Sequence, residues 1–270
     1  MCAINIDIMP LLTEHEFENI PCIKFLMRVL SIDKINDLYD RNKQCMGADF
    51  AHAVLQELGI RYQILNPEIL ESIPDGPFIT VSNHPYGHID GLILVDMFSG
   101  LRKDFKVMVN GILAKIAPLD GCFICVTPAG NEPSVPACDN IAGVKKVLMH
   151  VRCGHPLGIF PSGAVSDLSL KDGYVRDREW QEPVIRLIRK LHVPILPVAF
   201  LDGNSMFYYS LGLIDWRVRL LRLPSEVFNK KDTVQRIALG NPILPHMQDE
   251  YGNIAEFGRF LRQKVYELKL

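Results

Sequence analysis

The chain has 270 residues, 48% of them hydrophobic, and a formal net charge of −2. A chain of this length and composition can bury one substantial core, which argues against a disordered protein and favours one large domain. The nearly balanced charge gives no indication of a nucleic-acid partner.

Targeting signals and disulfides are not expected. The N-terminus, MCAINIDIMPLLTEHEFE, is acidic and lacks the basic and apolar stretches of a secretory signal. Seven cysteines at irregular spacing favour reduced thiols over a disulfide framework. No apolar run approaches the roughly 18 residues of a spanning helix. We therefore expect a cytoplasmic protein that does not span a membrane but can lie on one.

The first part of the chain is predicted to be helical. Apolar residues recur every three or four positions through residues 14–58, and Gly59 is placed to end the second helix. Residues 60–65 then alternate like a half-buried strand, and PDGP at 74–77 marks a turn. We divide the chain into an N-terminal helical segment, 1–46, which can contact a membrane surface, and a main domain, 47–270.

The main domain alternates short β-rich runs with helical patterns, which predicts an α/β fold with a mostly parallel central sheet flanked by helices. Further strands are expected in VRLLRL and TVQRIALG, and a last helix at 254–268. The alternating strands are expected at 77–83, 105–109, 122–126, 157–161 and 195–201, and the helices from about 90 and at 111–117, 140–151 and 183–191.

The stretch VSNHPYGHIDG, residues 81–91, carries the strongest indication of chemistry. His84 follows an expected strand, at the sheet edge where ligands bind in open α/β folds. Asp90 comes six positions later, and a carboxylate that orients an imidazole makes it a general base. Alternatively, Asp90 only caps the next helix and His84 is an ordinary loop residue. The spacing leaves both interpretations open.

Asn83-His84 followed by Asp90-Gly91 resembles the first motif of the glycerolipid (lysophospholipid) acyltransferase superfamily. The spacer is one residue longer than usual and is similar to that of the hemolysin-like branch, which includes ornithine- and glycine-type aminolipid O-acyltransferases. Where that branch has a glycine, this chain has His88. Further motifs occur in the expected order, and the resemblance covers about 47–243. These further motifs are FPSGAVS at 160–166, VPILPV at 193–198, the segment 106–126, GNS at 203–205 and RLPSEVFNKK at 222–231.

This resemblance implies a lipid-biosynthetic transferase of the same fold. In the implied mechanism, His84 deprotonates a lysolipid hydroxyl, Asp90 orients His84, and the alkoxide attacks a thioester. The co-substrate is acyl carrier protein (acyl-ACP) or acyl-CoA, with no other cofactor. The FPSG turn either presents backbone N–H groups to substrate or merely ends a strand. The implied substrate-binding residues are Asn83, Gly91, Pro161, Ser162 and Gly163.

Two departures from the family pattern bear on the acceptor. Ser162 and Val165 replace a glutamate and an arginine, and no arginine follows Val126. Without these charged groups a phosphate-bearing acceptor would bind poorly. The departures therefore favour a lyso-aminolipid as the acceptor. Transfer to 1-acylglycerol-3-phosphate remains an alternative if another cation reaches the site. The candidates for that role are Arg102, Lys103, Lys106, Arg176 and Arg178.

Other classes of protein also remain open: a non-catalytic, lipid-binding hemolysin-like protein, or an inactive relative. We expect no metal site, because Cys122 and Cys125 are on opposite faces of a strand and no second pair exists. Two segments that mix apolar and basic residues, 20–30 and 216–222, either dock on an anionic membrane or pack on the sheet. The resemblance favours a peripheral position on the inner face of the cytoplasmic membrane.

Overall fold

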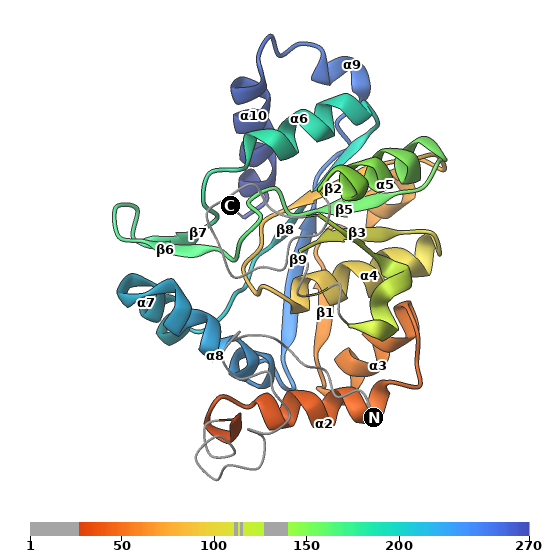
Figure 1. The fold of residues 1–270 in the computed structure, drawn as a ribbon. Helices are drawn as coiled ribbons and strands as arrows, with labels where there is room; N and C mark the ends of the chain where they lie inside the picture. The colour runs from red at the N-terminus through yellow and green to blue at the C-terminus, as the bar shows by residue number, and fades with distance from the viewer. Residues whose placement is uncertain (1–26, 111–112, 114–115, 127–139, 270) are drawn as a thin grey trace.

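A seven-stranded sheet forms the centre of the protein, in a computed structural model that describes residues 27–110, 113, 116–126 and 140–269. The strand order is β1-β9-β8-β2-β5-β3-β4 (Figure 1). The strands are β1 (Arg61–Ile64), β2 (Ile79–Ser82), β3 (Lys106–Val109), β4 (Phe123–Cys125), β5 (Leu157–Ile159), β8 (Ile195–Phe200) and β9 (Val234–Leu239).

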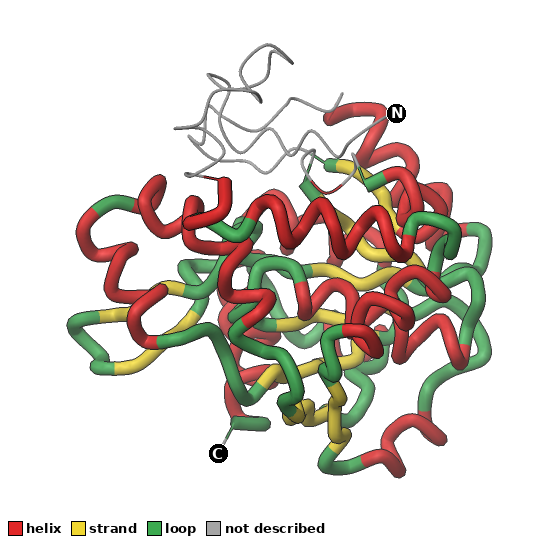
Figure 2. Tube along the Cα trace, turned by 90° about the horizontal axis from the view of Figure 1, so that it is seen from below, coloured by secondary structure: helices red, strands yellow, loops and turns green. Residues whose placement is uncertain are grey.

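Helices cover both faces of this sheet, as Figure 2 shows. The described helices are α2 (Ile32–Asn42), α3 (Ala48–Glu57), α4 (Ile89–Leu101), α5 (Asn140–Arg152), α6 (Glu182–Leu191), α7 (Met206–Ile214), α8 (Trp216–Phe228), α9 (Pro245–Gln248) and α10 (Ile254–Glu267). Side chains of α2, α3 and α4 form one core, and those of α5, α6 and α10 form a second core on the other face.

The predicted α/β architecture is confirmed. Every described strand pair of the sheet is parallel except β8 with β9. The central strands, β2, β5 and β8, are buried along their whole length. This burial explains why their sequences are continuously apolar rather than alternating. β2 lies between β5 and β8, so the loop after it leaves from the middle of the sheet.

The N-terminal helical prediction is confirmed for the part that the structure describes. Leu38 of α2 is buried in the same core as Phe50 of α3, so residues 32–42 pack on the main domain. Residues 14–26 and most of the helix expected at 111–117 lie outside the described residues.

The strand expected in VRLLRL is wrong, because these residues lie within α8. Six residues are too few to reveal the period: Trp216, Leu220 and Leu223 face one cavity at helical spacing. The antiparallel hairpin of β6 (Asp167–Ser169) and β7 (Tyr174–Arg176), and helix α7, were not predicted.

Among the cysteines that the structure describes, one departs from the expectation of reduced thiols. Cys45, Cys122 and Cys153 are free thiols, whereas Cys125 is disulfide-bonded. Cys122 and Cys125 are therefore not joined to each other. None of the described helices combines the length and apolar character needed to cross a bilayer.

Gly59 provides a test of the local fold. Its φ of +64° is one that side chains rarely adopt, and a Cβ there would also overlap Asp232. We expect Gly59→Ala to lower the free energy of unfolding by about 1–2 kcal/mol, measured by urea denaturation. Gly76→Ala is the control, because no atom lies near its Cβ position. Equal stability of the two variants would contradict this account.

Candidate active site

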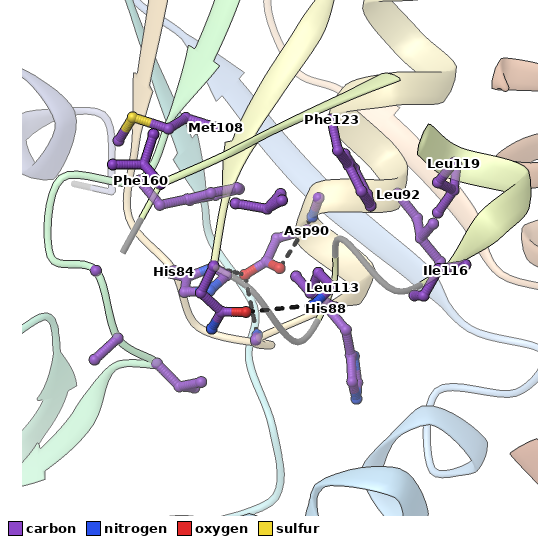
Figure 3. Close-up of a pocket in the computed structure, with 18 of the residues that line it drawn as sticks. His84, His88, Asp90, Leu92, Met108, Leu113, Ile116, Leu119, Phe123 and Phe160 are labelled. Carbon is purple, nitrogen blue, oxygen red and sulfur yellow. Dashed lines mark hydrogen bonds and ion pairs between the residues drawn. The ribbon is translucent and has the colours of Figure 1, made fainter. Parts of the chain in front are cut away.

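His84, in the loop between β2 and α4, faces Asp90 in the first turn of α4 (Figure 3). His84 Nδ1 lies 2.7 Å from Asp90 Oδ2, and their side chains are 14% and 0% exposed. The contact is an ion pair, and Nδ1 has no further hydrogen-bond partner among the described residues. Since Nδ1 faces Asp90, Nε2 is left on the cavity side of the ring, and His84 lines that cavity.

The Asp90 carboxylate also organises the backbone around it. Oδ2 accepts hydrogen bonds from the N–H groups of Tyr86 at 3.1 Å and Gly87 at 3.2 Å, and Oδ1 accepts one from Gly91 at 3.0 Å. Gly87 permits this tight reversal, because its φ is +87° and a Cβ there would meet Val165. Asp90 thus contacts the imidazole and also accepts hydrogen bonds from the loop and from the first turn of α4.

The pair shifts both pKa values toward the charged forms. Burial alone would lower the pKa of His84, but the adjacent Asp90 carboxylate outweighs burial and raises it. Burial alone would raise the pKa of Asp90, but His84 and the Gly87 N–H outweigh burial and lower it. The imidazole therefore has the electrostatic support that it needs to accept a proton.

Two distant segments hold the backbone of His84. Asp177, just after β7, accepts a hydrogen bond from the His84 N–H at 3.1 Å. The Ser166 N–H donates to the His84 carbonyl at 2.9 Å, and the Ser166 hydroxyl donates to Asp177 at 2.6 Å. No sequence motif pointed to Asp177, which is 93 residues from His84. The side of the His84 ring packs on Phe160, with ring centroids 4.2 Å apart.

Asn83 and His88 have backbone partners that fix the loop. The Asn83 amide donates to the Phe200 carbonyl at 2.9 Å and accepts from the Phe200 N–H at 2.8 Å. Asn83 therefore joins the ends of β2 and β8 through two hydrogen bonds. Its side chain is not part of the cavity lining. His88 caps α4 by accepting from the Ile89 N–H, and its Nε2 lies 3.2 Å from the Leu223 carbonyl. Burial lowers the pKa of His88.

The FPSG turn lies beside the histidine loop because β5 and β2 are neighbouring parallel strands. Gly163 lines the cavity with a φ of +65°, and Gln181 occupies the space that a Cβ would need. Gly91 also lines the cavity. Pro161 and Ser162 are buried outside the lining, and the Ser162 hydroxyl donates to the Ala164 carbonyl at 2.8 Å.

The GNS segment supports the loop from the other side. The Asn204 amide donates to the Tyr86 carbonyl at 3.1 Å, and the Tyr209 hydroxyl donates to the Pro85 carbonyl at 2.7 Å. Ser205 caps α7 and donates to Glu226 of α8. The downstream motifs therefore position the loop.

A cavity of about 930 Å³ extends from His84 across the carboxyl edge of the sheet. Its volume is at the upper end of the range for small-molecule pockets. The lining is largely aliphatic and aromatic; Figure 3 shows Leu92, Leu113, Ile116, Leu119 and Phe123 on one side and Met108 and Phe160 on the other. One end is lined by α2 and α3, and the other by α5 and α6.

The cations considered from the sequence do not line this cavity. Arg102, Lys103, Lys106, Arg176 and Arg178 are all absent from its described lining. Arg102 binds Asp104 and three backbone carbonyls, and Arg176 pairs with Asp172. The cations that do line the cavity are Lys145, Arg186 and Lys190 on α5 and α6, and Arg219, which is paired with Asp167.

No group of three His, Cys, Asp or Glu side chains suited to a metal ion occurs in the described part of the chain.

Comparisons with known proteins give one family and several relatives. A family model described as Acyltransferase matches residues 9–270. The lyso-glycine lipid O-acyltransferase of Bacteroides thetaiotaomicron is 25% identical over 255 residues, which cover 91% of this chain and 89% of that protein. The lyso-glycine lipid O-acyltransferase of Phocaeicola vulgatus is 24% identical over 258 residues, with coverages of 91% and 87%.

Among solved structures, the 1-acyl-sn-glycerophosphate (LPA) acyltransferase PlsC from Thermotoga maritima aligns with a TM-score of 0.48 and 14% identity. The alignment covers 91% of this chain and 92% of that one.

The coupling of His84 to Asp90 can be measured directly. In Asp90→Asn, burial remains but the carboxylate is lost, so the pKa of His84 should fall. Titration of the imidazole ring protons by NMR measures this change. An unchanged His84 titration would show that Asp90 does not control the imidazole.

Proposed function

Since the chain belongs to this acyltransferase family, we propose that it transfers a fatty acyl group from a thioester donor to the hydroxyl of a lysolipid, of the lyso-glycine aminolipid type. The observation that carries the proposal is the His84–Asp90 pair at a large apolar cavity. An imidazole backed by a buried carboxylate suits proton removal from a hydroxyl. The apolar lining on both sides of the pair gives room for acyl chains.

The proposed reaction is a direct transfer. Nε2 of His84 removes the proton of the acceptor hydroxyl as its oxygen attacks the thioester carbonyl. Asp90 stabilises the imidazolium, and backbone N–H groups near Gly163 are candidates to stabilise the oxyanion. The C–S bond then breaks, and the proton on His84 passes to the thiolate. The products are the acylated lipid and the free thiol of the carrier.

The lyso-aminolipid acceptor is supported by charge and by the relatives. Both curated relatives are named for lyso-glycine lipid. In the described lining Arg219 is already paired with Asp167, and the remaining cations lie on α5 and α6. Those cations support 1-acylglycerol-3-phosphate as the alternative acceptor, because a phosphate needs charged donors. For the donor we propose acyl-ACP or acyl-CoA, and for the location the inner face of the cytoplasmic membrane.

His84→Ala should abolish the activity. We expect kcat/KM to fall by about 1,000-fold or more, because no other group replaces the general base. The assay follows thiol release from acyl-ACP and acyl-CoA with lyso-glycine lipid or 1-acylglycerol-3-phosphate as acceptor. Circular dichroism checks the fold, and His246→Ala, an exposed histidine of α9, is the matched control. Full activity of His84→Ala would refute the mechanism, and transfer only to the phosphate acceptor would refute the aminolipid.

The raised pKa of His84 predicts the acid side of the pH profile. Only neutral imidazole accepts a proton, so kcat/KM should fall as the pH drops through the pKa of His84, with a midpoint above 6.5. In Asp90→Asn the residual activity should have a lower midpoint, because the carboxylate no longer favours imidazolium. Rates of both proteins measured across pH test this sign. A midpoint that rises in Asp90→Asn would contradict it.

A further inference from the structure

Helix α7 has an unusual composition for a helix at the surface. Its nine residues, MFYYSLGLI, include no charged side chain. A helix that is apolar on all sides is normally buried on all sides. Tyr208 and Tyr209 are buried against the rest of the protein. Figure 1 shows α7 at the edge of the molecule, on the far side of α8 from the sheet.

The outer face of α7 exposes large apolar side chains. Met206 and Phe207 are 57% and 60% exposed, and Leu213 and Ile214 are 47% and 78% exposed. Leu213 is seven positions after Met206, and Ile214 is seven positions after Phe207. This spacing of about two turns places all four side chains on one side of the helix. Val218 of α8, 42% exposed, adds a fifth apolar side chain. We call these five residues the α7 face.

The α7 face is held in place by a defined support. Ser205 caps α7 and donates to the carboxylate of Glu226, which is fully buried in α8. Arg219 of α8 pairs with Asp167 of β6, and α7 also contacts β6. The exposed apolar side chains therefore lie on a firmly packed pair of helices.

Arginine and aromatic side chains flank the α7 face. The Arg222 guanidinium lies 5.7 Å from the centre of the Phe207 ring, and that of Arg217 lies 4.9 Å from the Trp216 ring. Arg217 is also 3.7 Å from Asp215, the cap of α8. Apolar side chains bordered by arginine and aromatic rings match the boundary between lipid headgroups and acyl chains.

The opposite side of α8 leads into the cavity. Trp216, Leu220 and Leu223 line the cavity that contains His84. A lipid that leaves a bilayer at the α7 face would therefore have to pass only α8 to reach the general base.

We propose that the α7 face docks on an anionic membrane surface and delivers the lysolipid acceptor to the cavity. The proposal rests on the proposed function, because it identifies the source of its acceptor. Arg217 is exposed and Arg222 is half-buried, and their positive charge exceeds the single negative charge of the neighbouring Asp215, so it complements anionic headgroups. A second protein molecule fits less well, since five side chains are far fewer than the roughly 20–30 residues per partner of a stable interface.

Vesicle flotation of the full-length protein tests the α7 face. With vesicles of phosphatidylcholine and phosphatidylglycerol, the double variant Phe207→Ser/Ile214→Ser should bind about tenfold more weakly or worse. The matched control is Leu65→Ser/Met149→Ser, whose apolar side chains are 49% and 57% exposed on other elements and should not affect binding. Arg217→Gln should weaken binding to these vesicles by about fivefold and leave binding to pure phosphatidylcholine unchanged.

Activity measurements separate this inference from the proposed function. Phe207 and Ile214 do not line the cavity, so the double variant should transfer normally to a monomeric acceptor and slowly to one in vesicles. Unchanged vesicle binding by the double variant would show that the α7 face is not the docking surface, even if acyl transfer is active. Weakened vesicle binding in a protein without any transfer would refute the proposed function but support the docking surface.

Two further outcomes would assign the α7 face or the membrane contact differently. If Phe25→Ser/Leu26→Ser abolishes flotation while the α7 double variant floats normally, the segment 20–30 is the anchor. If the α7 double variant changes the molar mass in solution but not flotation, a second copy of the chain covers the face. Either result overturns the proposal.

Discussion

The buried carboxylate of Asp90 is the constraint on which the site depends. A charge with no exposed surface is costly unless it is paired and hydrogen-bonded. Asp90 meets this requirement with N–H groups of its own loop and with the imidazole of His84. The same bonds that stabilise the charge therefore set the path of the loop and the orientation of the ring. The Asp90 carboxylate therefore joins the first turn of α4 to the histidine loop.

That interaction alone would leave the His84 backbone free to move. Hydrogen bonds from Ser166 and to Asp177 fix it, and they come from the loop after β5 and from the end of β7. The hairpin of β6 and β7, outside the main sheet, thus places Asp177 next to the backbone of His84. Since catalytic geometry must be held to a fraction of an ångström, such supports matter as much as the reacting groups.

The sequence was most informative where structure is local. The alternation of strands and helices predicted the sheet. The short spacing between His84 and Asp90 allowed a contact but left it open, and the structure shows that contact. Contacts between distant segments were not predictable: Asp177 is 93 residues from its partner. The resemblance implied that Asn83 binds substrate. In the structure its amide is instead hydrogen-bonded to the backbone of Phe200, which depends on β8 lying next to β2. Helix α7 was missed because its uniformly apolar sequence has no helical period.

Val165, one of the departures from the family pattern, has a definite place in the packing around the loop. Val165 packs with Tyr208 and Tyr209, and it occupies the space beside Gly87. An arginine at that position would bring an unpaired charge into this cluster, at a cost that the nearby Asp167, already paired with Arg219, would not offset. Val165 thus contributes to the packing that shapes the loop around Asp90. The aliphatic side chain at position 165 and the buried pair of His84 and Asp90 are therefore connected through the packing of one loop.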